Sequence, residues 1–160
     1  MVGHSEQCPV CGMEVKDRSY PFEYSRVFYH FCSEQCRDMF RAHPRLYFGK
    51  RSGRHREMIR SRTLPLAGTW PPEVYEQVER KLGELMGVQA VHIDDDGLVI
   101  RYDLLQVTLA RIESTLAELG VVLDNGWWQR ARRAWMRTTE ANALDNLATP
   151  GTCCNKPPHR

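Results

Sequence analysis

CPVCGM at residues 8–13 and FYHFCSEQC at residues 28–36 are the stretches that decide the fold of the first part of this chain. Two residues separate the first pair of cysteines, three separate the second pair, and twenty lie between the pairs. Two close pairs of thiolates can supply a tetrahedral shell with metal–sulfur distances of about 2.3 Å. The spacing therefore predicts a metal site formed by Cys8, Cys11, Cys32 and Cys36.

The remaining two of the six cysteines, Cys153 and Cys154, are adjacent near the end, and none occurs from Arg37 to Gly151. In a reducing compartment, clustered cysteines are metal ligands or redox groups rather than disulfides. The opening residues MVGHSEQCPVCG lack the apolar core of a secretory signal. We therefore expect a cytoplasmic protein with reduced thiols.

The residues around the second cysteine pair predict a hairpin followed by a helix. Residues 21–31 are rich in Phe, Tyr and Val, which favours β-structure. Ser33 is a suitable N-cap, and Pro44 should end or kink the helix that follows. Cys36 would then lie in the first helical turn, where the helix dipole helps to keep its thiol ionised.

The identity of the metal stays open at this point. Zn²⁺ is the first expectation at four thiolates, but such sites also bind Cu⁺ and other soft ions. A structural or regulatory zinc, an exchangeable transition metal and a pair of redox thiols are the alternatives. Met13 and His30 are secondary candidate ligands, although a histidine near a metal site more often packs around the ligands.

The motifs of this segment are similar to those of a known family. CPVCGM, YHFCS and the later Phe40, Pro44 and Tyr47 resemble the YHS/TRASH metal-binding module over about residues 6–49. Tyr29, His30 and Ser33 occupy the positions that give the module its name. The resemblance implies a treble-clef-like fold and a role in heavy-metal resistance, trafficking or sensing.

A second unit is predicted over residues 63–124, with the order βαββαβ of a ferredoxin-like domain. Prolines at 71 and 72 open a helix, and the sequence DDDG marks an Asp-Gly turn between two strands. The expected strands are residues 63–66, 88–93, 98–102 and 121–123. Two helices are expected: the run EVYEQVERKLGELMG, which follows the two prolines, and residues 105–119.

This unit resembles the heavy-metal-associated domain of copper chaperones and metal-pumping ATPases. GVQAVHID at 87–94 and LVIRYD at 98–103 continue the match, and Gly68 stands where that family has a loop glycine. The loop positions that would be cysteine are Pro71 and Val74, neither of which can bind a metal. We therefore expect a contact surface or scaffold, with His92 only a secondary candidate ligand.

The last segment is expected to be a helix followed by an irregular tail. In NGWWQRARRAWMR, Trp128, Ala131 and Trp135 recur at helical spacing among arginines. The simpler interpretation is that the tryptophans pack the helix onto one of the domains while the arginines are solvated. The other interpretation is a basic amphipathic surface for an anionic membrane or an acidic partner.

The tail ATPGTCCNKPPHR carries a possible second metal site. Its Pro and Gly residues predict irregular structure. Cys153 and Cys154 could capture a soft ion such as Cu⁺ or Hg²⁺, with help from His159. They could instead be a redox pair, ligands that complete another site, or incidental. If they bind metal, the tail could pass an ion to or from the N-terminal cluster.

Composition limits the other function classes. The formal net charge is only +2 over 160 residues, so nucleic acid is not an expected partner, although residues 50–62 are locally basic. No run of apolar residues reaches the ~18 that a membrane span needs. No arrangement typical of a hydrolase, a nucleotide-binding enzyme or a metalloprotease occurs, so we do not expect an enzyme.

These observations predict an α+β protein in four parts: a four-cysteine metal-binding module at 1–49, a basic linker at 50–62, a ferredoxin-like domain at 63–124, and a Trp/Arg-rich helix with a CC-containing tail at 125–160. We expect it to buffer, sense or deliver copper, silver, mercury or zinc. The family resemblances imply delivery to a metal-transporting ATPase or a metal-resistance protein. The alternative is a structural-zinc docking module or a nucleic-acid-binding, transcriptional module.

Overall fold

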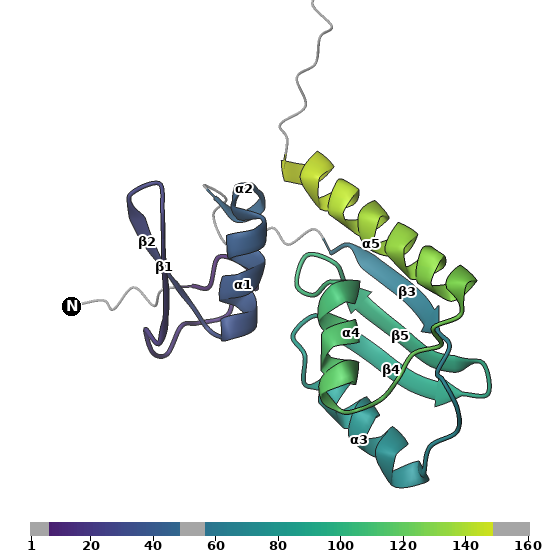
Figure 1. The fold of residues 1–160 in the computed structure, drawn as a ribbon. Helices are drawn as coiled ribbons and strands as arrows, with labels where there is room; N and C mark the ends of the chain where they lie inside the picture. The colour runs from purple at the N-terminus through teal and green to yellow at the C-terminus, as the bar shows by residue number, and fades with distance from the viewer. Residues whose placement is uncertain (1–6, 49–56, 149–160) are drawn as a thin grey trace, which may run out of the picture.

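The computed structural model describes residues 7–48 and 57–148 and contains both helices and antiparallel sheets. An N-terminal unit, residues 7–48, holds a two-stranded hairpin and two helices. A second unit, residues 57–148, holds a three-stranded sheet and three helices. Figure 1 shows the two units side by side, with α1 on the side of the N-terminal unit that faces the second unit.

The hairpin of the N-terminal unit consists of β1 (Tyr20–Tyr24) and β2 (Val27–Phe31), which pair antiparallel. Ser25 and Arg26 connect them with φ angles of 52° and 62°. Positive φ at both central residues is typical of the type I′ turn, whose twist matches that of the strands. The hairpin predicted at residues 21–31 is therefore confirmed.

Helix α1 (Glu34–Ala42) begins where Ser33 was predicted to cap it. The Ser33 hydroxyl accepts a hydrogen bond from the Cys36 backbone N–H at 3.3 Å. The helix ends before Pro44, which opens the short helix α2 (Pro44–Tyr47) at a position where a missing N–H has no cost.

Aromatic side chains form the core of the N-terminal unit, with Phe40 of α1 at its centre. This ring is fully buried, and its centroid lies 4.8–6.1 Å from those of five other aromatic rings. Edge-to-face and tilted pairs at these distances stabilise a core beyond simple area burial. The five partners are Phe22, Tyr24, Tyr29, Phe31 and Tyr47.

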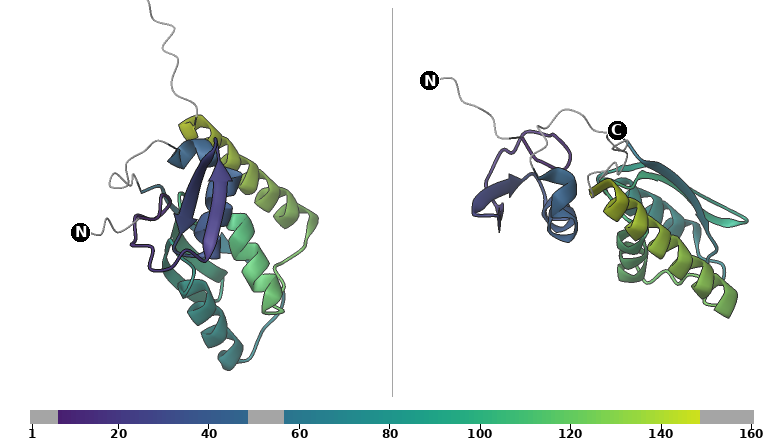
Figure 2. Two further views of the ribbon diagram at one scale, coloured as in Figure 1. Left: turned by 90° about the vertical axis from the view of Figure 1, so that its left-hand side faces the viewer. Right: turned by 90° about the horizontal axis from the view of Figure 1, so that it is seen from above.

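The second unit is built on strands β3 (Ile59–Leu64), β4 (Val88–Asp94) and β5 (Gly97–Asp103), which form an antiparallel sheet in the order β3-β5-β4. Helices α3 (Pro72–Gly83), α4 (Leu109–Glu118) and α5 (Trp127–Ala148) cover one face of this sheet (Figure 2). Side chains of β5 that face the helices are fully buried, as expected for the central strand of a sheet covered on one side.

Several predicted boundaries in this unit differ from the structure. Helix α3 ends at Gly83 rather than near residue 87, and α4 begins at Leu109 rather than at residue 105. Strand β3 begins at Ile59, so residues 59–62 belong to the sheet and not to a solvated linker. The strand expected at 121–123 is reduced to one bridge between Leu66 and Leu123. Backbone hydrogen bonds from Ala67 and from Asp124 flank that bridge, and the chain then turns away into α5. The full ferredoxin-like topology stays a prediction.

The tight connection between β4 and β5 depends on Gly97. This residue is buried with φ +123°, and a Cβ placed on it would lie 2.5 Å from the Leu64 carbonyl oxygen. We expect Gly97→Ala to lower the free energy of unfolding by about 2–4 kcal/mol. The control Gly83→Ala at the end of α3 meets no atom within 4 Å and should raise it by about 0.5–1 kcal/mol. Urea unfolding followed by circular dichroism compares them; equal effects would contradict the steric argument.

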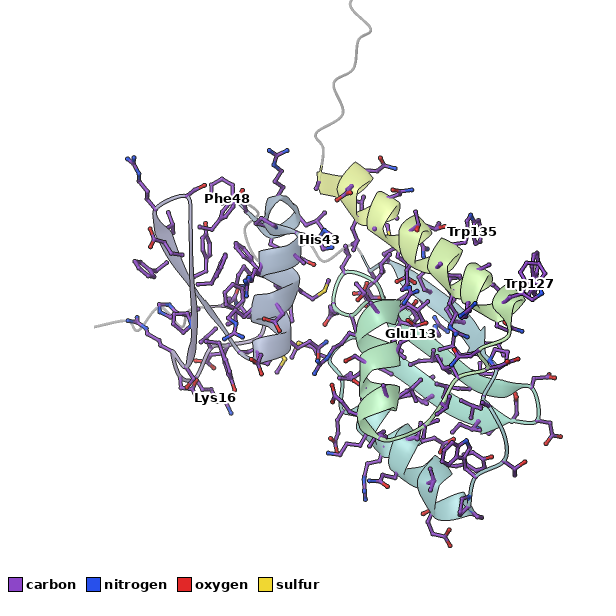
Figure 3. All side chains as sticks on the ribbon, viewed as in Figure 1. Lys16, His43, Phe48, Glu113, Trp127 and Trp135 are labelled. Carbon is purple, nitrogen blue, oxygen red and sulfur yellow. The ribbon has the colours of Figure 1, made fainter. Side chains whose placement is uncertain are left out.

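Helix α5 packs by a different face from the one predicted. Trp127, Trp128 and Trp135 are 73%, 64% and 69% exposed, and Figure 3 shows the two labelled ones pointing away from the sheet. The buried residues of the helix are instead Arg133, Met136, Glu140 and Leu144. The interpretation that tryptophans pack this helix is therefore wrong, and its arginines are solvated as expected except for the buried Arg133.

Polar partners set the register of α5. Arg133 donates to the Asp124 carbonyl and the Asn125 side chain, and Glu140 accepts from Tyr102 and from the Leu109 N–H. Rotating the helix to bury its tryptophans would leave these buried groups unpaired, at a cost of about 1–3 kcal/mol for each group. None of the helices in the described parts of the chain is long and apolar enough to cross a membrane.

Candidate metal centre

The first two cysteines lie in a tight backbone turn. The Cys8 N–H donates to the Met13 carbonyl and the Gly12 N–H donates to the Cys8 carbonyl, each at 2.8 Å. Gly12 has φ +76°, a conformation that glycine adopts without steric cost. A bridge between Gln7 and Glu14 closes the base of the turn. The turn thereby presents both thiols in one direction.

The other two cysteines come from the junction of β2 and α1. Cys32 follows the last residue of β2, and Cys36 lies in the first turn of α1. The Cys32 Sγ atom is 3.3 Å from that of Cys11 and 3.7 Å from that of Cys36. All four Sγ atoms lie within 4.8 Å of one another. The structure therefore brings the four cysteines of the predicted cluster together.

These distances fit a four-coordinate ion. Sulfur atoms placed about 2.3 Å from a tetrahedral centre are about 3.8 Å apart, close to the separations seen here. The four cysteines form no disulfide. A donor set of four thiolates suits zinc, Cu⁺ and other thiophilic ions and does not suit magnesium or calcium. The four cysteines would hold the ion and supply its negative charge.

The site is buried on one side and accessible on the other. Cys8 and Cys36 are almost fully buried, whereas Cys11 and Cys32 are half-buried. An ion can therefore reach the cluster past Cys11 and Cys32, while the other two thiols are sealed by the core.

The crowded thiols share their protons unequally. Hydrogen bonds from Cys11 and then from Cys36 lower the pKa of the Cys8 thiol. Hydrogen bonds with Cys11 and then Cys8, together with burial, raise the pKa of Cys36 well above its usual value. The helix dipole was expected to keep Cys36 ionised, but its neighbours and its burial outweigh the dipole. A cation would be needed to hold all four groups as thiolates.

The cysteine cluster adjoins the interface with the second unit. Met86, which lies between α3 and β4, has its Sδ atom 3.3 Å from the Cys36 Sγ atom. Beside it, the Gln35 side chain hydrogen-bonds to the backbone of Met86 and of Gln106. Tyr47 donates to the Leu105 carbonyl at 2.7 Å. Figure 3 shows side chains of the two units meeting beside α1.

The secondary candidate ligands differ in position and exposure. Met13 is 57% exposed, and His30 lies in β2 opposite Pro21, outside the group of four. His92 is exposed on β4, 3.7 Å from a Glu79 carboxylate oxygen. Pro71 precedes α3 and Val74 lies within it. Neither side chain has an atom that can bind a metal. Cys153, Cys154 and His159 lie outside the described residues, so the predicted second site stays a prediction.

Sequence reasoning did not find Met86 or Gln35. Met86 is 50 residues from Cys36 in the chain, in the ordinary run ELMGV at the end of a helix. No local spacing points to a contact of that kind. A glutamine between two cysteine-motif residues likewise gives no signal, because its partners are backbone atoms of the other unit.

Comparison with known proteins supports the N-terminal resemblance. No curated protein matches the chain. The resemblance of residues 63–124 to the heavy-metal-associated domain stays a prediction. Residues 7–51, which include all four cysteines of the cluster, match the YHS domain family.

Proposed function

We propose that this protein binds a soft transition metal ion and buffers, senses or delivers it. The observation that carries the proposal is the gathering of four thiols, from two separate elements, within 4.8 Å. Thiolates favour copper, silver, mercury and zinc over the abundant hard cations. The match of the same residues to the YHS domain adds to this argument.

Exchange, rather than permanent binding, is supported by the position of the site at the surface of its unit. Cys11 and Cys32 remain half-buried, so a partner can approach two of the four ligands. The second unit, which resembles a metal-associated domain without its cysteines, would act as a contact surface. We propose that the partner is a metal-transporting ATPase or a metal-resistance protein, and that the ion serves metal efflux.

The alternative, a structural zinc in a nucleic-acid-binding module, is less well supported. Arg62 lies 3.8 Å from the buried Glu140, and Arg133 and Arg137 both lie against Glu113 in the cleft of about 490 Å³ between α4 and α5. Guanidinium groups held by carboxylates are poorly placed to neutralise phosphates. We therefore favour metal handling, by binding rather than catalysis, in the cytoplasm where thiols stay reduced.

Metal content is the direct test of this proposal. We expect protein purified without oxygen to hold about one ion per chain, as four thiolates require. Cys8→Ser combined with Cys36→Ser should remove that ion, because it deletes both buried ligands. The matched control, Cys153→Ser with Cys154→Ser, should keep it.

Elemental analysis followed by Zn²⁺ and Cu⁺ titration against a competing chelator gives the measurement. Equal metal content in wild type and the Cys8/Cys36 variant would contradict the proposal. One tightly held zinc without high-affinity Cu⁺ uptake would favour the docking or nucleic-acid alternative. Cu⁺ uptake that falls in the Cys153/Cys154 variant would instead place the tail in the pathway of the ion.

A further inference from the structure

The cysteine cluster has a fifth sulfur atom beside it, supplied by the other unit. The Met86 Sδ atom lies 3.3 Å from the Cys36 Sγ atom, the same distance as separates the Cys11 and Cys32 Sγ atoms within the cluster. Sulfur ligands of one ion lie about 3.8 Å apart. The Met86 thioether accepts the hydrogen bond of the Cys36 thiol, so it lies against one of the four thiols at a separation shorter than two ligands of one ion show.

The backbone of Met86 is held in place by the residue next to Cys36. The Gln35 amide accepts a hydrogen bond from the Met86 N–H at 3.1 Å and donates to the Met86 carbonyl at 2.7 Å. Its second N–H donates to the Gln106 carbonyl at 3.0 Å. Both polar ends of the side chain are thus used in a geometry that fixes Met86 relative to α1.

Close packing on the second unit makes this arrangement possible. Gly87 has φ +92°, and a Cβ placed on it would lie 2.5 Å from the Gln106 Cβ. The segment that carries Met86 can therefore approach the segment that carries Gln106 until one glutamine side chain spans both carbonyls. The thioether is presented to the thiols by a rigid connection rather than by a loose loop.

The chemistry of the thioether points to the kind of ion it serves. A thioether is neutral and soft, so it adds affinity for Cu⁺ or Ag⁺ and little for Zn²⁺. Zinc satisfies its tetrahedral preference with the four thiolates alone. A monovalent soft ion accepts mixed thiolate and thioether ligands. The position of Met86 therefore bears on the selectivity of the site.

We propose that Met86 is a ligand of the metal centre, reached across the interface between the units, and that it favours Cu⁺ or Ag⁺ over Zn²⁺. This inference rests on the proposed metal-binding function. It implies that the bound ion joins the two units, because Cys36 belongs to the first and Met86 to the second. It also gives the second unit, which lacks the loop cysteines, a direct part in binding.

Met86→Leu tests the proposal, because leucine keeps an apolar side chain of similar volume and removes the sulfur. We expect it to weaken Ag⁺ and Cu⁺ binding about tenfold or more, within the range known for residues that tune metal sites. Zn²⁺ affinity should change by less than about threefold, since the four thiolates are untouched. Met13→Leu is the matched control: this methionine is exposed and should alter neither affinity.

Competition titrations on the full chain measure both ions in wild type and both variants, and methyl-labelled methionine supplies a second readout. With the Zn²⁺-loaded chain as reference, replacing Zn²⁺ by Ag⁺ should shift the Met86 ε-methyl NMR signal, assigned from its loss in Met86→Leu, and should leave the Met13 signal unchanged. Unchanged Ag⁺ affinity in Met86→Leu, or equal weakening of both ions, would overturn the proposal. Failure of wild type to bind either ion would instead overturn the metal-binding function itself.

Discussion

Removal of the metal is expected to unfold residues 7–48 while strands β3, β4 and β5 stay folded. The N-terminal unit is close to the size of about 40 residues below which domains usually need metals or disulfides. Two of its buried apolar side chains, Cys8 and Cys36, are themselves candidate ligands. Binding of a structural ion contributes on the order of 10 kcal/mol to such units. Without the ion, only the aromatic cluster around Phe40 is left to stabilise the unit, against the crowding of four thiols.

Amide hydrogen exchange with and without a strong chelator measures this effect. Amides of α1 and of the β1–β2 hairpin should lose their protection, and those of β5, the central strand, should keep it. In the Cys8→Ser, Cys36→Ser variant, the amides of α1 and of the hairpin should lack protection even without chelator. If α1 keeps its protection after complete removal of the metal, the aromatic core alone holds the unit together and the expectation is wrong.

Replacing Glu140 by alanine is expected to cost about 3–5 kcal/mol of stability, the loss typical of breaking a buried ionic network. Glu140 is 3% exposed on α5. It accepts hydrogen bonds from the Tyr102 hydroxyl and from the Leu109 N–H, and it lies 3.8 Å from Arg62. One carboxylate thus joins α5 to β5, α4 and β3. Its charge also lies at the N-terminus of α4, where the helix dipole favours an anion.

The alanine variant would remove the acceptor of the buried Tyr102 hydroxyl and of the Leu109 N–H, and the carboxylate beside the partly exposed Arg62. Burial and then the hydrogen bond to Glu140 raise the pKa of the Tyr102 hydroxyl, so it stays protonated and needs an acceptor. Calorimetry should show the unfolding temperature of the second unit falling by roughly 15 °C or more.

Two controls separate the network from the loss of a side chain. Glu140→Gln keeps hydrogen-bonding capacity and should cost less than alanine. Glu76→Ala, exposed on α3, should change stability by no more than about 0.5 kcal/mol. A Glu140→Ala variant as stable as Glu76→Ala would show that the network contributes nothing.

Local signals predicted the parts of the structure that local chemistry determines. The hairpin follows from its aromatic and β-branched residues, the start of α1 from Ser33, and its end from Pro44. The gathering of the four cysteines also follows from spacing, because each pair lies within one short segment and only one closure joins them. The same reasoning predicted the β4–β5 hairpin from its Asp-Gly turn.

The features that the sequence did not predict correctly depend on contacts between distant parts of the chain. The face of α5 was predicted from apolar spacing, but buried hydrogen bonds of Arg133 and Glu140 decide it. The strand at 121–123 has the composition of a strand, yet the start of α5 limits its pairing to one bridge. Met86 reaches Cys36 only because two units dock, and no pattern within either unit encodes that contact.

The outward tryptophans of α5 have an optical consequence. All four tryptophans of the chain, Trp70 and those at 127, 128 and 135, belong to the second unit, and the three on α5 already stand in water. The N-terminal unit has tyrosines but no tryptophan. Intrinsic indole emission is therefore dominated by residues that neither folding nor an ion at the thiols will desolvate. A flat fluorescence titration would say nothing about occupancy of the thiol site, which has to be followed through its own thiolate absorption.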